Sequence, residues 1–174
     1  MRADTGSAGD RRDTRDERRQ FVAFARESGL YPACGDGHPN LYQLFVERCL
    51  TLTRAGGRLG LIVPWGLASD HGSAGLRRAL LERCRIDRLV AFDNARGLFP
   101  IHRGVRFLLL SASSGSPTVS VSCRFGERDP SVLGTIDREA PEEGTIRLTP
   151  AQLRRYSGDS LAFPHVRSDA DVRL

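Results

Sequence analysis

Residues 56–66, GGRLGLIVPWG, decide the fold class of this chain. Two glycines end a helical pattern, an uncharged apolar run follows at residues 59–63, and Pro64 stops it. A run that is apolar on both sides is typical of a strand in a parallel sheet covered by helices. We therefore expect residues 59–63 to form a buried strand of an α/β sheet.

The segments around this strand alternate between helical and strand patterns. Before it, Asn40 and Gln43 have the spacing of a capping box at the start of a helix. The apolar face expected for that helix consists of Leu41, Leu44, Phe45, Cys49 and Leu52. After the strand, a helix is expected to begin at Ser69 or Asp70, and apolar strands follow at residues 86–92 and 105–110. This order is the βαβ alternation of an open α/β sheet.

The two ends of the chain have a different composition. Residues 1–19 are polar and predict either disorder or the solvated start of a helix over about residues 13–28. Residues 111–117, SASSGSP, have the composition of a linker, and a short strand is possible at 118–125. Thr149 and Pro150 are typical of a helix start. We expect three parts: a polar segment at 1–19, a domain at 20–115, and a linker with a further region at 116–174.

Composition excludes several classes of protein. The chain has 174 residues, enough for one domain, and no apolar run that could cross a bilayer, so no membrane partner is expected. The N-terminus lacks the apolar core of a secretory signal, which favours a cytoplasmic location. All 26 basic residues are arginine and the net charge is +5, which permits a polyanionic partner, although 21 acidic residues are interspersed.

The four cysteines indicate buried free thiols, because no pair has Cys-x-x-Cys spacing. Cys34 and His38 have a spacing that could hold a metal ion, but no second ligand pair follows them. A plain loop is the favoured interpretation, and no metal site is expected.

The stretch SGLYPACGDGHPNLYQLFVERCLTLTRAGGRLGLIVPWGLASD, followed by IDRLVAFDNARGLFPIHRGVRFLLL, closely resembles adenine-N6-specific DNA methyltransferases. The resemblance is to the large methylases of restriction–modification and phage-defence systems. It covers about residues 20–115, with weaker similarity at LTPAQLRRY and SLAFPHVRSD. It implies a partial Rossmann-like methyltransferase sheet of about three core strands with flanking helices, with S-adenosylmethionine as cofactor and double-stranded DNA as partner. The C-terminal region is then expected to begin a target-recognition region.

The resemblance assigns a base-binding role to one loop. These enzymes extrude the target adenine from the duplex, and an aromatic surface then replaces its lost stacking. By resemblance, Phe99 and Pro100 form that surface. The alternative from the residues alone is that Phe99 only plugs its loop onto the core.

The resemblance also implies residues that line the cofactor pocket or the substrate cleft. Asn40, Tyr42 and Phe45 match the helix that borders the cofactor pocket, and Phe45 is expected either to touch the cofactor's adenine ring or to join the core. Pro64 and Trp65 end a strand at the edge where open α/β sheets bind ligands. Trp65 is therefore expected to line the substrate cleft or to cover the sheet edge.

Two motifs of these methyltransferases are absent from the sequence. One is the glycine-rich cofactor loop with its ribose-binding acid, and the other is the Asn-Pro-Pro-aromatic tetrapeptide that orients the target amino group. We therefore assign no catalytic residue and expect the C-terminal half of a catalytic domain, completed by an upstream polypeptide. The alternative is a catalytically inactive methyltransferase-like module that binds DNA or a partner protein. Methylation of RNA or of a protein amide is a third, less favoured interpretation.

Overall fold

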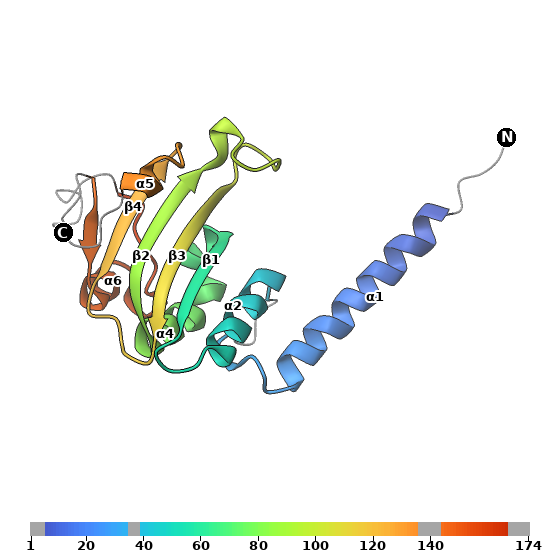
Figure 1. The fold of residues 1–174 in the computed structure, drawn as a ribbon. Coiled ribbons are helices and arrows are strands. Elements are labelled where there is room, and N and C mark those ends of the chain that lie inside the picture. The colour runs from blue at the N-terminus through green and yellow to red at the C-terminus, as the bar shows by residue number, and fades with distance from the viewer. Residues whose placement is uncertain (1–5, 35–38, 136–143, 167–174) are drawn as a thin grey trace.

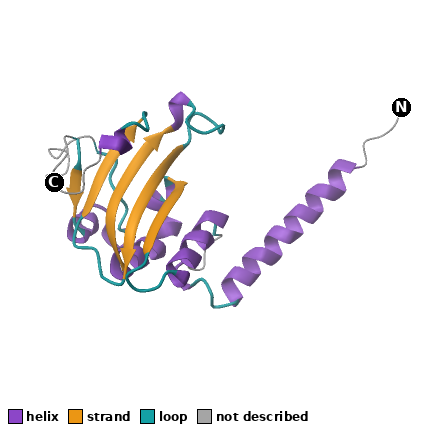
Figure 2. Cartoon of the chain, viewed as in Figure 1, coloured by secondary structure: helices purple, strands orange, loops and turns teal. Residues whose placement is uncertain are grey.

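A computed structural model describes residues 6–34, 39–135 and 144–166, which form one five-stranded sheet with its larger helices on one face (Figure 1). The strands are β1 Arg58–Pro64, β2 Cys84–Asp93, β3 Arg106–Ser114, β4 Val121–Glu127 and β5 Ile146–Leu148. The helices are α1 Gly6–Glu27, α2 Leu41–Leu52, α3 Gly66–Ser69, α4 Ala74–Arg83, α5 Val132–Thr135 and α6 Pro150–Ser157. Helix α1 leads away from the sheet (Figure 2). Among the described residues, no helix has the length and apolarity needed to cross a bilayer.

The sheet is mixed, with strand order β1-β3-β2-β4-β5. The α/β class and the three expected strands are confirmed, but β3 lies antiparallel between β1 and β2. Strand β4 pairs parallel to β2, and β5 pairs antiparallel to β4. The sheet therefore continues past residue 115, and β1 forms one of its borders.

The sequence predicted that the strand at residues 59–63 would be buried on both of its faces, and this prediction is wrong. Leu59, Leu61 and Val63 are buried beneath the helices, whereas Ile62 on the opposite side is 58% exposed. The reason is that the larger helices cover one face of the sheet (Figure 1), so the residues of β1 alternate between the covered face and the open face. The open side of β1 is an apolar surface.

The apolar face expected for α2 is wrong in part, although its start at Asn40 is confirmed and Leu44 is buried as expected. The residues that α2 buries are Gln43, Leu44, Val46, Glu47 and Leu50. Leu41, Phe45 and Leu52 are instead 71%, 59% and 69% exposed. Helix α2 therefore turns a partly polar face inward and an apolar face outward.

Hydrogen bonds explain why α2 buries polar side chains. The Glu47 carboxylate accepts from the backbone N–H groups of Ala33 and Cys34 at 2.7 and 3.0 Å. The Gln43 amide donates to Ser73 Oγ at 2.8 Å. A buried polar group is tolerated when such partners are present. These bonds hold the segment before α2 and the start of α4 against α2.

Several element boundaries differ from the sequence-based expectations. Helix α1 begins at Gly6, which corresponds to the solvated-helix alternative, and residues 1–5 lie outside the described residues. Helix α4 begins at Ala74, after a short 3-10 turn, His71–Ser73. Helix α6 has the expected start, with Thr149 Oγ accepting from the Gln152 N–H at 3.2 Å.

The expected linker at 111–117 is wrong for its first four residues, which end β3. Ser111 lies between Gly60 of β1 and Arg88 of β2, and Ala112 is completely buried. Small residues read as a linker by composition, but here they fit between two neighbouring strands. A segment with the composition of a linker therefore forms the end of β3, an interior strand of the sheet.

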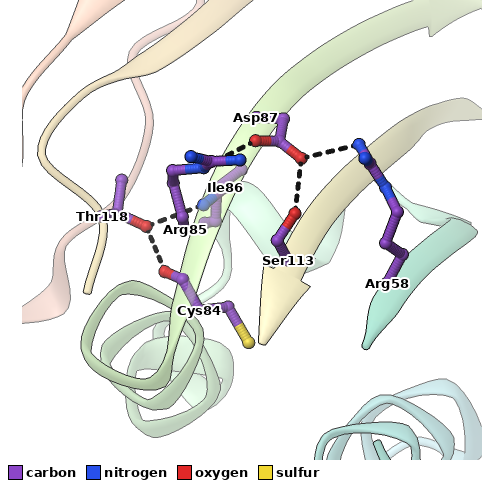
Figure 3. A network of polar contacts seen from close by, with 7 residues as sticks. All are labelled: Arg58, Cys84, Arg85, Ile86, Asp87, Ser113 and Thr118. Atoms are coloured by element: carbon purple, nitrogen blue, oxygen red, sulfur yellow. Dashed lines mark hydrogen bonds and ion pairs between the residues drawn. The ribbon is translucent and has the colours of Figure 1, made fainter. Parts of the chain in front are cut away.

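A polar network joins the strands at the amino end of β2 (Figure 3). Asp87 occupies an irregularity in the β2–β3 register and accepts from Arg58 of β1 at 3.3 Å and from Ser113 of β3 at 3.1 Å. Arg85 adds a bond to Asp87 at 3.0 Å. Both arginine side chains are more than half exposed, so each ion pair contributes at most about 1 kcal/mol. The network mainly fixes the alignment of the strands.

Candidate functional site

The loop between β2 and β3 lies at the carboxyl end of β2 and begins with a short 3-10 turn, Asn94–Arg96. Asn94 is completely buried. Its Oδ1 accepts from the Phe99 N–H at 2.9 Å, and its two Nδ2 hydrogens are shared among the carbonyl oxygens of Phe99, Ile101 and His102 at 3.2, 3.3 and 3.4 Å. The Asn94 side chain thus takes the place of regular backbone hydrogen bonds and fixes the conformation of the loop.

Phe99 is held by this loop at the edge of the sheet. Its ring meets Phe107 edge-on, with 4.9 Å between the centroids, and Phe107 stacks on Phe92 at 5.3 Å. Phe99 nevertheless remains 38% exposed, and Pro100 beside it is exposed. The ring is anchored on the core and also offers free aromatic surface. Its role as a platform for a base stays a prediction.

Trp65 closes the carboxyl end of β1. It is 8% exposed, and its ring lies edge-on to Phe125 and His165 at centroid distances of 6.0 and 5.7 Å. The guanidinium of Arg106 lies over the same ring, 5.7 Å from its centroid. This burial fits a cover for the sheet edge, and a role in lining a substrate cleft stays a prediction.

The remaining site residues fall into two groups. Pro64 is paired in register with Phe107, the residue on which Phe99 packs, so Pro64 and Phe99 flank the same ring. Asn40, Tyr42 and Phe45 lie together in the first turns of α2. Burial raises the pKa of Tyr42, whose hydroxyl lies 3.3 Å from Ser73 Oγ. These assignments to the cofactor pocket also stay predictions.

Two buried polar residues escaped the sequence analysis. One is Asn94, which follows a strand and looks like an ordinary turn residue. The other is Arg77 of α4, 2% exposed, whose Nε donates to the Ser160 carbonyl at 2.8 Å and whose Nη1 donates to the Leu67 and Asp70 carbonyls at 2.9 and 2.8 Å. Burial lowers the pKa of Arg77 to about 10. An arginine inside a run of apolar helix positions is the signal that could have revealed it.

The described residues do not by themselves fit S-adenosylmethionine. Phe45 supplies one exposed aromatic face, but the sequence has neither the glycine-rich loop nor the acid that would complete such a pocket. A groove of about 440 Å³ lies elsewhere, along α4 and α6, with Arg78, Pro117 and Leu161 among its lining residues. A role for Phe45 in binding the cofactor therefore stays a prediction.

Residues 14–99 match the Eco57I restriction-modification methylase family. Comparison with curated protein sequences gives no match. Among solved structures, the EcoKI M protein of a type I restriction enzyme is similar with 14% identity and a TM-score of 0.57, over 72% of this chain and 37% of that one. A modification subunit of a putative type I restriction enzyme from Vibrio vulnificus YJ016 is similar with 17% identity and a TM-score of 0.56, over 75% of this chain and 33% of that one.

A third solved structure, from a study of complex assembly and conformational transition in a type I R-M system, shares 19% identity. Its TM-score is 0.51, over 72% of this chain and 32% of that one. At these identities the likeness shows the fold. This chain spans about a third of the length of each of the three structures.

Proposed function

Because residues 14–99 match the Eco57I restriction-modification methylase family, we propose that this chain is part of a DNA methyltransferase that transfers a methyl group from S-adenosylmethionine to adenine N6. The observation that carries this proposal is Phe99, anchored on Phe107 yet 38% exposed at the carboxyl edge of the sheet. Stacking on an aromatic ring stabilises an unpaired base by about 1–3 kcal/mol. That energy offsets part of the cost of extruding the base.

The proposal includes an upstream polypeptide segment that completes the domain. Within the described residues, β1 pairs on one side with β3, and its other side is an unpaired edge. Beside that edge, α2 exposes Leu41, Phe45 and Leu52, and β1 exposes Ile62. An unpaired strand edge next to exposed apolar side chains is a surface that another segment covers. We assign that segment the glycine-rich loop and the Asn-Pro-Pro-aromatic motif.

The test is methylation of plasmid DNA by the chain together with the polypeptide encoded directly upstream, with tritiated S-adenosylmethionine. Digestion to nucleosides and chromatography identify the methylated base. We expect N6-methyldeoxyadenosine from the pair and none from this chain alone. N4-methyldeoxycytidine would contradict the adenine assignment, and DNA binding without any methylation by the pair would favour an inactive binding module.

The Phe99→Ala variant tests the platform within the same assay. We expect a fall in methylation of about 5- to 150-fold, which corresponds to the loss of about 1–3 kcal/mol of stacking. Tyr156→Ala is a matched control, because Tyr156 on α6 is also an exposed aromatic residue and lies outside the loop. Equal activity of the Phe99→Ala variant and the unaltered protein would contradict the platform.

A further inference from the structure

The loop that carries Phe99 and the first residue of β3 together carry three arginines and no acidic residue. The sequence over residues 94–106 is NARGLFPIHRGVR. Acidic residues accompany the arginines through most of the chain, but this stretch has a charge of +3 with histidine neutral. Arg96, Arg103 and Arg106 are all exposed. This stretch therefore combines three exposed arginines with an exposed aromatic ring.

Two of these guanidinium groups are held in place by the fold. Arg103 Nη1 donates to the Ala95 carbonyl at 3.1 Å, so its side chain folds back over the loop. Arg106 lies over the Trp65 ring at 5.7 Å from the centroid. Both contacts leave guanidinium hydrogens unused, and both reduce the side-chain entropy that a later ligand contact would cost.

Two nearby carboxylates are hydrogen-bonded to groups other than the three arginines. Asp93 is bonded to Arg128 at 3.2 Å, and the Asp129 carboxylate accepts from the Ser131 N–H at 2.9 Å. Arg96 adds to the lowering of the Asp129 pKa, after the hydrogen bonds from Ser131. In the parts of the chain that the structure describes, none of the three arginines forms an ion pair with a carboxylate.

We infer that Arg96, Arg103 and Arg106 bind the backbone phosphates of DNA on either side of the nucleotide whose base stacks on Phe99. This inference rests on the proposed function and names the contacts that hold the strand at that site. Arginine is always charged and presents a fork of donors that matches phosphate oxygens. The loop framed by Asn94 would hold all three against the backbone while Phe99 takes the base. The arginines supply position and affinity, and the ring supplies the base contact.

The experiment measures DNA binding as a function of salt. A fluorescein-labelled 20-base-pair duplex with one extrahelical adenine is titrated by anisotropy with the full chain, paired with the upstream polypeptide, between 50 and 250 mM NaCl. Each lost phosphate contact lowers the slope of log K against log salt by about 0.9. We expect the triple variant Arg96→Gln, Arg103→Gln, Arg106→Gln to lose about 2–3 from that slope.

A matched triple variant removes the same charge elsewhere: Arg54→Gln, Arg83→Gln, Arg155→Gln. All three of these arginines are exposed and lie away from the loop, at the amino end of the sheet or on α6. We expect this control to change the slope by less than about 0.5. Equal slopes for the two triple variants would overturn the inference, because binding would then depend on net charge alone. Circular dichroism checks that both variants keep the fold.

Phe99→Ala separates this inference from the proposed function. It removes the ring and no charge, so it should lower the affinity for the extrahelical adenine and leave the salt slope unchanged. If Phe99→Ala has no effect while the loop triple variant lowers the slope, the phosphate contacts stand and the base platform fails. If the loop triple variant leaves the slope unchanged while Phe99→Ala weakens binding, the phosphate contacts fail.

Discussion

The two faces of α2 differ from those of an ordinary amphipathic helix, because the inward face mixes polar with apolar residues and the outward face exposes large apolar ones. Its inward face buries Gln43 and Glu47, both bonded to neighbouring segments. Its outward face presents Leu41, Phe45 and Leu52 to solvent. Hydrogen bonds explain the buried polar residues, but nothing in the described residues covers the exposed apolar ones. The inner face therefore serves this chain's fold, and we propose that the outer face is the interface with the upstream segment.

Removing the Glu47 carboxylate should give the largest change in stability. Glu47→Ala leaves the Ala33 and Cys34 N–H groups buried without an acceptor, and we expect the free energy of unfolding to fall by about 2–4 kcal/mol. Urea denaturation followed by circular dichroism measures it. Leu44→Ala on the same face gives the cost of an apolar truncation for comparison. A change below 0.5 kcal/mol for Glu47→Ala would show that the inner polar face does not stabilise the fold.

Arg77 extends the same comparison to α4. Arg77→Met keeps the apolar volume but loses the three bonds to the carbonyls of Ser160, Leu67 and Asp70. We expect a loss of about 1–3 kcal/mol, because those carbonyls lose charged donors. Hydrogen exchange should also show earlier opening of residues 158–163. Neighbouring Arg78, which is exposed, supplies the control Arg78→Met. Equal effects of the two substitutions would contradict a specific role for Arg77.

A substitution on the outward face of α2 should weaken association with the upstream polypeptide and leave the stability of the isolated chain almost unchanged. Phe45→Ser should change the free energy of unfolding of the isolated chain by no more than about 0.5 kcal/mol, since the side chain is exposed. It should weaken association with the upstream polypeptide by at least about tenfold, measured by calorimetry. Tyr156→Ser on α6 is the control for an exposed aromatic residue. Unchanged association of the Phe45→Ser variant would remove α2 from the interface.

The cysteine thiols should have the smallest effect on the free energy of unfolding, and this effect should depend on pH. Burial raises the pKa of Cys34, with a further contribution from the Glu47 carboxylate, and burial also raises the pKa of Cys84. A raised thiol pKa means that the folded state keeps protons that the unfolded state loses. Stability is therefore full below the unfolded thiol pKa of about 8.5 and falls as pH rises above it. Urea titrations at pH 7 and 9.5 measure this decrease, and a rise at pH 9.5 would contradict it.

The sequence predicted the elements of the fold better than their faces. The strands at residues 59–63, 86–92 and 105–110 form as expected because each contains a short apolar run. The α2 face was wrong because Glu47 and Gln43 find partners from Ala33 and Ser73, which are close only after folding. The antiparallel place of β3 depends on the whole sheet, and no local pattern encodes it.

The candidate site was predictable only in part. Phe99 and Pro100 were found through a family resemblance, and the structure shows how Asn94 holds them at the edge of the sheet. Asn94 itself was missed because a single asparagine after a strand looks like a turn residue until the four hydrogen bonds of its side chain are known. Arg77 was missed because its acceptors are main-chain carbonyls, two of them several residues away and one 83 residues away.

The most direct test of the central claim is calorimetric titration of S-adenosylmethionine into this chain alone, into the upstream polypeptide alone, and into their equimolar mixture. We predict no binding by this chain alone and the strongest binding by the mixture, because in the proposed function this chain supplies one wall of the cofactor site. We also predict that Phe45→Ser weakens binding by the mixture. Absence of binding by the mixture, or full-strength binding by this chain alone, would contradict the account.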